Sequence, residues 1–79
     1  MITNAMFWGA IDRLAAANHI SCSRMARNSG IDLTALNKSK RTGPGGRQYW
    51  MSVGTLVKIL DATKTEWAEF AKYFPQPEK

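Results

Sequence analysis

The stretch SCSRMARNSGIDLTALNKSKR, residues 21–41, decides the fold of this chain. Ser21 is a favourable N-cap, because its hydroxyl can accept a hydrogen bond from an unpaired backbone N–H, and a short helix is predicted to follow it. Gly30 stands where a helix commonly ends in a left-handed residue, which glycine adopts without steric cost. Asp32 is a second favourable N-cap and opens a predicted helix over residues 33–40. Two short helices joined by a turn that contains glycine form the helix-turn-helix pattern.

The close crossing of two such helices sets demands on particular positions. The first helix, predicted over residues 22–28, needs a small residue where the second helix touches it, and the turn needs a residue free to adopt a positive φ. Both helices also need apolar residues that hold them to the core. The residues that meet these demands are Met25, Ala26, Gly30, Ile31 and Leu36. Five positions in register favour the helix-turn-helix interpretation over a chance pattern.

Apolar residues at helical spacing predict one helix before this pattern and two after it. A helix is predicted over residues 4–18, a second after the N-cap Ser52, and a third between the N-cap Thr65 and Pro75. Their apolar faces are predicted to consist of Phe7, Trp8, Ile11, Leu14 and Ala15, of Val53, Leu56, Val57 and Leu60, and of Trp67, Phe70, Ala71 and Phe74.

The remaining residues complete an all-α prediction. Three glycines and one proline over residues 42–47 support neither helix nor strand, so this segment is predicted to be a loop. No β-type alternation of any length occurs. The sequence therefore predicts a compact five-helix domain over residues 1–74, in which the second and third helices form the helix-turn-helix. Residues 75–79 are predicted to be a tail or a truncated linker.

Size and cysteine content limit the kind of protein. Seventy-nine residues suffice for one domain and are too few for two. Cys22 is the only cysteine and cannot form an internal disulfide, which favours a reducing, intracellular setting. No run approaches the roughly 18 apolar residues that a membrane-spanning helix needs. We therefore expect a cytoplasmic protein with no membrane partner.

The charge of the chain favours a polyanionic partner. Eleven Lys and Arg against six Asp and Glu give a formal net charge of +5. Residues 38–47 contain Lys38, Lys40, Arg41 and Arg47 and no acidic residue. Nucleic acid is the first candidate for such a surface and an anionic membrane the second.

No pattern of catalytic or metal-binding residues is visible. His19 and Cys22 lie three residues apart, but without a second pair they do not form a zinc site. The Gly-rich segment 43–46 follows a predicted helix and lacks the Lys-Ser/Thr of a phosphate-binding loop. We therefore expect no enzyme activity, no metal and no cofactor.

Residues 21–41 resemble the helix-turn-helix of lambda-repressor-like and Cro-like regulators. The continuation GRQYWMSVGTLVKILDATKTEWAEF is similar to the last two helices of that family, and LNKSKR…GR…W resembles the N-terminal domain of LexA-like, self-cleaving phage-type repressors. The resemblance covers roughly residues 7–74. Ser29 and Ser39 depart from it, since the family usually has an apolar residue or Ala there. The Ser-Lys peptidase domain of the self-cleaving repressors is absent from this sequence.

The resemblance implies which residues contact DNA. In this family the second helix of the motif places its side chains in the major groove. Asn can pair with adenine, Lys can donate to guanine, and Thr can offer a hydroxyl, or a methyl group to thymine. The implied base contacts are Leu33, Thr34, Asn37 and Lys38, and the implied phosphate contacts are Ser21, Ser23, Lys40, Arg41 and Arg47.

The expected function is therefore sequence-specific binding of double-stranded DNA by a transcriptional regulator, with repression as the family's usual mode. A homodimer would read a pseudo-palindromic operator whose half-sites lie one helical turn apart, about 34 Å. The alternative is a helical protein-interaction module of antitoxin or adaptor type, because fold alone does not fix function. Four cations around the predicted third helix favour DNA.

Overall fold

The computed structural model describes residues 1–75, and this part of the chain is mostly helical with no β-strand. The α-helices are α1 (Asn4–Ala17), α2 (Cys22–Asn28), α3 (Val53–Ala62) and α4 (Trp67–Ala71). Two short 3₁₀ helices, η1 (Lys38–Lys40) and η2 (Pro44–Gly46), lie between α2 and α3. The all-α prediction is confirmed, but the described residues form four α-helices where the sequence analysis expected five.

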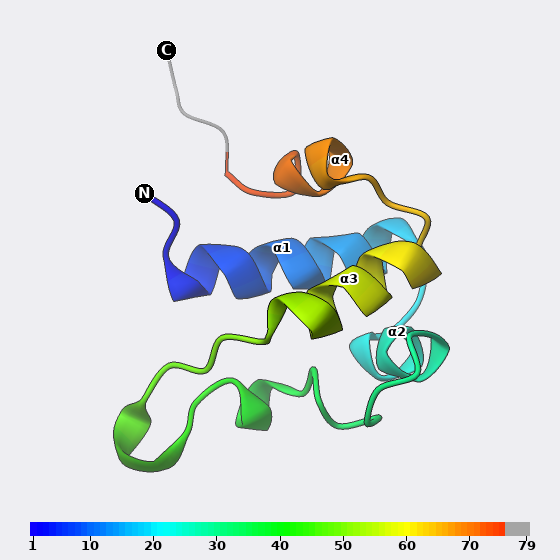
Figure 1. The fold of residues 1–79 in the computed structure, drawn as a ribbon. Helices are drawn as coiled ribbons and strands as arrows, with labels where there is room; N and C mark the ends of the chain where they lie inside the picture. Colours follow the sequence, from blue (N-terminus) through cyan, green and yellow to red (C-terminus); the bar gives the residue numbers. More distant parts are fainter. Residues whose placement is uncertain (76–79) are drawn as a thin grey trace.

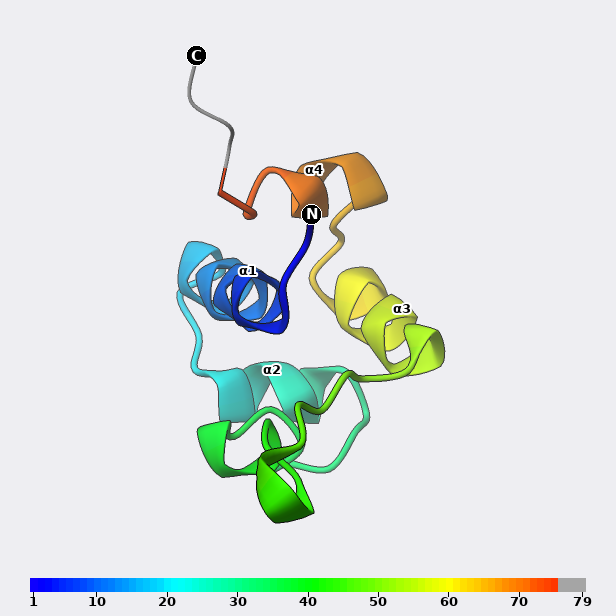
Figure 2. The ribbon, with the colours of Figure 1, turned by 90° about the vertical axis from the view of Figure 1, so that its left-hand side faces the viewer.

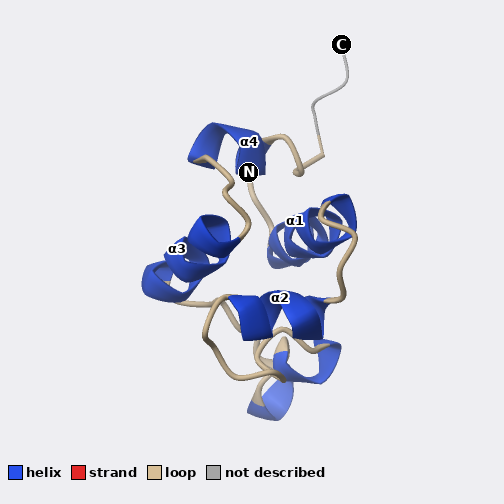
Figure 3. Cartoon of the chain, turned by 90° about the vertical axis from the view of Figure 1, so that its right-hand side faces the viewer, coloured by secondary structure: helices blue, strands red, loops and turns tan. Residues whose placement is uncertain are grey.

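The four helices surround one core. Figures 1 and 2 show α1 and α3 at mid-height, with α4 above them and α2 below. Figure 3 shows the same order from the opposite side, with the loops between α2 and α3 at the bottom. Ile11 and Leu14 of α1, Met25 of α2 and Ile59 of α3 are fully buried in this core. Leu36, from the connection after α2, completes it.

Helix α1 forms where the sequence predicts it. Thr3 caps it, and its hydroxyl oxygen accepts a hydrogen bond from the backbone N–H of Met6 at 3.1 Å. The predicted apolar stripe from Phe7 to Ala15 is buried. The chain leaves the helix through His19, which has a positive φ of 57°.

Helix α2 and its ends also follow the prediction. The Ser21 hydroxyl oxygen accepts from the backbone N–H of Arg24 at 3.1 Å. At the other end Gly30 has a φ of +74°. The Gly30 N–H donates to the Arg27 carbonyl, and the Ile31 N–H donates to the Ala26 carbonyl. This pair of bonds is the Schellman motif, which satisfies the last carbonyls of a helix and needs glycine at the left-handed position.

The predicted helix over residues 33–40 is wrong. Residues 33–36 form a turn, Asn37 is extended with φ −65° and ψ 147°, and only η1 is helical. The Asp32 side chain still caps the segment, accepting from both the N–H and the hydroxyl of Thr34. An eight-residue helix gains few backbone hydrogen bonds against the cost of nucleation, and Thr, Asn and Ser are weak helix formers. Contacts to other parts of the fold set this segment instead.

Two details of the C-terminal helices also differ from the prediction. Ser52 caps α3 as expected, but its buried face is Leu56, Ile59 and Leu60. Val53 is 71% exposed and Val57 38% exposed. The alternative stripe has the same helical spacing and buries the larger Ile, which removes more apolar surface from water.

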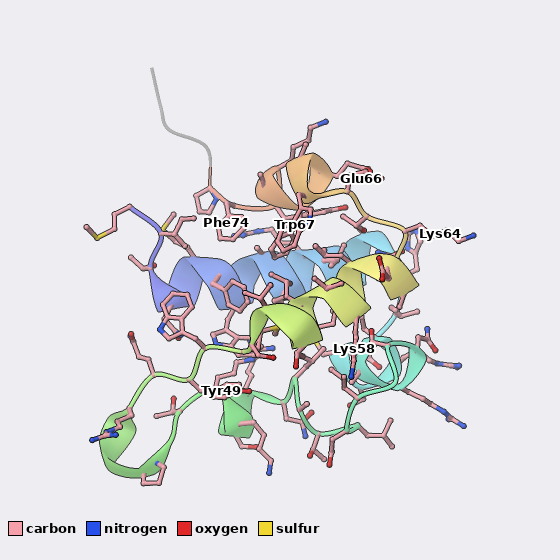
Figure 4. All side chains as sticks on the ribbon, viewed as in Figure 1. Tyr49, Lys58, Lys64, Glu66, Trp67 and Phe74 are labelled. Atoms are coloured by element: carbon pink, nitrogen blue, oxygen red, sulfur yellow. The ribbon has the colours of Figure 1, made fainter. Side chains whose placement is uncertain are left out.

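Helix α4 is capped by Glu66, which forms a capping box with Glu69, and not by Thr65. The Thr65 hydroxyl lies 2.8 Å from that of Thr63 instead. Phe70 is buried as predicted, whereas Trp67 is 54% exposed. Figure 4 shows Trp67 and Phe74 on the upper side of the molecule.

Candidate nucleic-acid interface

The positive charge of the chain is concentrated in one part of it. Residues 20–48, which we call the basic end, contain six Lys and Arg and a single acidic residue, so they carry the whole net charge of +5. The rest of the sequence contains five cations and five acidic residues and is neutral. In Figure 1 the basic end forms the lower part of the molecule, on the side of α1 and α3 away from α4.

Most cations of the basic end are directed to solvent. The side chains classed as exposed are Arg24, Arg27, Lys38, Lys40 and Arg47. Asp32 is the only acidic residue of the basic end, and hydrogen bonds from Thr34 lower the pKa of its carboxyl. Five exposed cations on one side of a small domain create a strong local positive potential.

Arg41 has a different environment from these five. Its guanidinium donates to both carboxylate oxygens of Asp12, at 2.7 and 3.0 Å, and to the Leu36 carbonyl at 2.8 Å. Its carbon Cζ lies 4.5 Å from the centre of the Trp8 ring. The Arg41 side chain is 12% exposed. It was predicted to contact phosphate, but these partners occupy its donors, so it leaves the candidate phosphate set.

The Asp12–Arg41 pair also affects the cysteine. The Arg41 hydrogen bonds lower the pKa of the Asp12 carboxyl, and Asp12 raises the pKa of Arg41. The Cys22 thiol lies 3.4 Å from the same carboxylate. Burial raises the pKa of this thiol, and the neighbouring carboxylate raises it further. Cys22 is therefore held as a neutral thiol, which is a poor nucleophile.

The four predicted base contacts lie on the turn that follows α2. Leu33 is 51% exposed, and Thr34 and Lys38 are exposed as well. Asn37 is half-buried, and its carbonyl accepts from the Lys40 N–H at 2.9 Å. Because the segment is not an α-helix, Thr34, Asn37 and Lys38 do not lie on one face of a helix. The residues share a short exposed connection instead.

The predicted phosphate contacts Ser21 and Ser23 lie at the start of α2. Together with Arg24, Arg27 and Leu33 they line a shallow hollow. The Ser21 hydroxyl oxygen is used as the cap of α2. Lys40 and Arg47, which were also predicted to contact phosphate, are exposed on the connection between α2 and α3.

The residues predicted to hold the motif together lie toward the core. Met25, Ala26 and Leu36 are buried, and Ile31 is half-buried and packs against the core cluster. Gly30 occupies the left-handed position. Ser29, at one of the two departures from the family pattern, donates its hydroxyl to the Met25 carbonyl at 2.7 Å.

Sequence reasoning gave too little weight to two groups of residues. Nothing in the sequence distinguishes Arg24 and Arg27 from ordinary surface charges, but the structure places them beside Leu33 around the same hollow. Asn4, Trp8 and Asp12 of α1 bind the loop after η1 through hydrogen bonds and an ion pair. Asn4, Trp8 and Asp12 are spaced four residues apart, which places them on one face of a helix. This spacing is visible in the sequence and could have predicted that the three side chains act together.

Other kinds of site are not visible in residues 1–75. This part of the chain contains no cluster of three or more His, Cys, Asp or Glu side chains suited to a metal ion. None of its helices combines the length and apolar character needed to cross a membrane. Of the predicted tail, residues 76–79 lie outside the described residues.

Comparison with known proteins adds no assignment. Neither protein-family models, curated proteins nor solved structures give a match to this chain.

Proposed function

We propose that this chain binds double-stranded DNA through its basic end and acts as a sequence-specific transcriptional regulator of the repressor type. The observation that carries the proposal is the location of the entire net charge of +5 in residues 20–48, with five of the six cations exposed. Lys and Arg on one surface neutralise phosphates and release their counterions, which supplies the sequence-independent part of DNA affinity.

The base-reading part of the proposal assigns to the turn over residues 31–41, which follows α2, the place that the second helix has in a helix-turn-helix. The Schellman turn after α2 directs the chain out of the core, and Leu33, Thr34 and Lys38 are exposed on the segment that follows. Leu33 offers an apolar contact, and Thr34 offers a hydroxyl. Asn37 adds an amide and Lys38 an ammonium, and all four groups suit base edges in the major groove. Lys40, Arg47, Ser21 and Ser23 flank them as proposed phosphate contacts. Arg24 and Arg27 join this set.

Two copies on a pseudo-palindromic operator would extend the proposal. Half-sites one helical turn apart, about 34 Å, would each receive one basic end.

The alternative function, a protein-interaction module, has one observation in its favour. An apolar groove of about 620 Å³ lies at the end of the molecule away from the basic end. It is lined by Met1, Ile2, Met6, Phe7, Trp50, Leu56, Trp67, Phe70, Ala71, Phe74 and Pro75. This groove does not explain the concentration of charge on the other side, so DNA binding remains the better supported function.

The test is selection of duplexes from a random pool, followed by fluorescence anisotropy with the selected and a scrambled duplex at two salt concentrations. We expect Asn37→Ala to reduce the preference for the selected duplex by roughly 5- to 100-fold, the range expected for loss of one bidentate base contact. Binding to the scrambled duplex should change little. Asn18→Ala, which removes an amide outside the basic end together with its hydrogen bond to the Leu14 carbonyl, is the matched control; with its fold verified by circular dichroism, it should leave the preference intact.

Equal binding to every duplex would reduce the proposal to non-specific DNA binding. Absence of binding to any duplex at low salt would refute it and favour the protein-interaction module.

A further inference from the structure

The loop between Arg41 and Tyr49 is closed at its base by backbone hydrogen bonds. The Tyr49 N–H donates to the Arg41 carbonyl at 2.9 Å, and the Gly43 N–H donates to the Arg47 carbonyl at 2.6 Å. These bonds make Thr42 and Gln48 an isolated antiparallel bridge. Above this bridge the chain reverses through Gly45 and Gly46, which have positive φ values of 72° and 79°. The loop therefore has a defined shape in spite of its glycines.

Three side chains on one face of α1 hold the two ends of this loop. The Asn4 amide and the Trp8 indole N–H both donate to the Tyr49 carbonyl, at 2.9 and 3.1 Å. Asp12 binds the Arg41 guanidinium, which also lies over the Trp8 ring. The rings of Trp8 and Tyr49 are stacked, with centres 6.3 Å apart. Figure 4 shows Tyr49 below α1, at the base of the loop.

The tip of the loop contributes nothing to the core. Pro44, Gly45, Gly46 and Arg47 are exposed, and a Cβ added to either glycine at positions 45 and 46 would meet no atom within 4 Å. Ordering a Gly-rich segment costs more conformational entropy than ordering other sequences. A loop that is held by polar contacts at its base and exposed at its tip is typical of a binding element whose shape is set before the ligand arrives.

We infer that this loop is a second DNA-contacting element, and that its tip enters the minor groove next to the major-groove contact. The inference rests on the proposed function. The Pro44–Gly46 turn at the tip has no bulky side chain except the ring of Pro44, so it suits a groove only about 6 Å wide. Arg47 stands directly beside it, and arginine is favoured in the narrow, strongly negative minor groove of A·T-rich DNA. Asn4, Trp8 and Asp12 are positioning residues in this arrangement.

The experiment compares flanking base pairs outside the core of a duplex selected by the full chain. Hydroxyl-radical footprinting locates the flank, and its pairs are then made A·T, G·C or I·C. Inosine lacks the amino group of guanine in the minor groove but keeps the major-groove pattern of guanine. A minor-groove contact predicts equal affinity for A·T and I·C flanks and an affinity lower by on the order of 10-fold for G·C flanks.

Three variants connect this preference to the loop. Arg47→Gln should abolish the flank preference and the flank footprint, whereas Lys64→Gln, which removes one charge from the opposite end of the molecule (Figure 4), should keep both. Asn4→Ala combined with Trp8→Phe removes both donors to the Tyr49 carbonyl. We expect that double variant to lose the flank preference and keep discrimination of the core sequence, with circular dichroism to verify its fold.

The outcomes separate the two proposals. Equal affinity of the native chain for all three flanks, or an unchanged preference in Arg47→Gln, would overturn the loop inference and leave the major-groove reading intact. Failure of the selection to yield any preferred core sequence would remove the proposed function itself, and the loop inference with it.

Discussion

The basic end and the apolar groove lie on opposite sides of the same central helix but are built in different ways. Asn4 and Trp8 of α1 bind the base of the charged loop, whereas Met6 and Phe7, one or two positions away, line the groove. The basic end exposes cations on short connections that hydrogen bonds hold in place. The groove exposes aromatic surface such as that of Trp50 and Trp67, which are 49% and 54% exposed.

This difference shows how so small a domain can present two surfaces of unlike chemistry. Arg41 forms an ion pair with Asp12 of α1, so one cation of the basic end fixes this part of the chain against α1. The other five remain exposed. The far side of the molecule is neutral, so it neither attracts nor repels a polyanion strongly. For the proposed DNA partner, this charge would orient the molecule as well as attract it.

The largest expected effect comes from removing the exposed charge of the loop region. We expect the triple variant Lys38→Gln, Lys40→Gln and Arg47→Gln to lower affinity for a random-sequence duplex by roughly 100-fold or more at about 0.1 M salt. The slope of log K against log salt should become shallower by about 2.7, because in the sequence-independent complex with a random duplex each of these three cations neutralises one phosphate and contributes about 0.9. A salt series followed by anisotropy measures both quantities.

The matched control removes the same number of charges from the neutral part of the molecule. Arg13→Gln, Lys64→Gln and Lys72→Gln together should change the salt slope by much less than the first triple variant. Equal losses in the two triple variants would show that net charge alone governs binding, and the contrast between the two ends would have no functional meaning.

A smaller effect is expected from the ion pair that holds the basic end. Arg41 keeps the pKa of Asp12 below its unfolded-state value, so the ionised carboxylate stabilises the fold above about pH 3.9. This stabilisation is lost as the pH falls through the lower, folded-state pKa. Since the Asp12 side chain is 41% exposed, Asp12→Asn should reduce the free energy of unfolding at pH 7 by only about 1 kcal/mol.

Urea denaturation at neutral and acidic pH checks this expectation. The difference between the native chain and Asp12→Asn should shrink toward zero as the pH falls below the lowered pKa of Asp12, where both carry a neutral side chain. Asp61→Asn, at an exposed position of α3, is the control and should stay within about 0.5 kcal/mol of the native chain at every pH. A difference for Asp12→Asn that persists unchanged in acid would argue against the ion pair as its cause.

The parts of the fold that are determined by residues close together in the sequence could be predicted from it. The caps Ser21 and Ser52 and the left-handed Gly30 act within four residues of their partners, and each helix end occurs where they indicate. Residues 33–40 carry similar local signals, but the Arg41 contacts to Leu36 and Asp12 fix their end from outside. Helix propensity over eight residues is too weak to resist such tertiary constraints.

The candidate site shows the same limit. Arg41 and Arg47 occur in the same basic run, and nothing local distinguishes an arginine that binds solvent from one that binds Asp12, 29 residues earlier. Composition predicted the sign of the surface but not which cations are exposed. In the same way, Val53 and Ile59 both fit an apolar stripe on α3, and only the packed core decides between them.

The most direct test of the central claim is a map of the surface that DNA contacts. A short random-sequence duplex titrated into the isotope-labelled chain at low salt, with backbone amide shifts recorded by NMR, gives this map. We predict that the largest shift changes fall in the basic end, residues 20–48, with those of α4 and of Phe74 nearly unchanged. If the largest amide shift changes instead occurred around Trp67 and Phe74, with those of the basic end unchanged, DNA binding through the basic end would be contradicted.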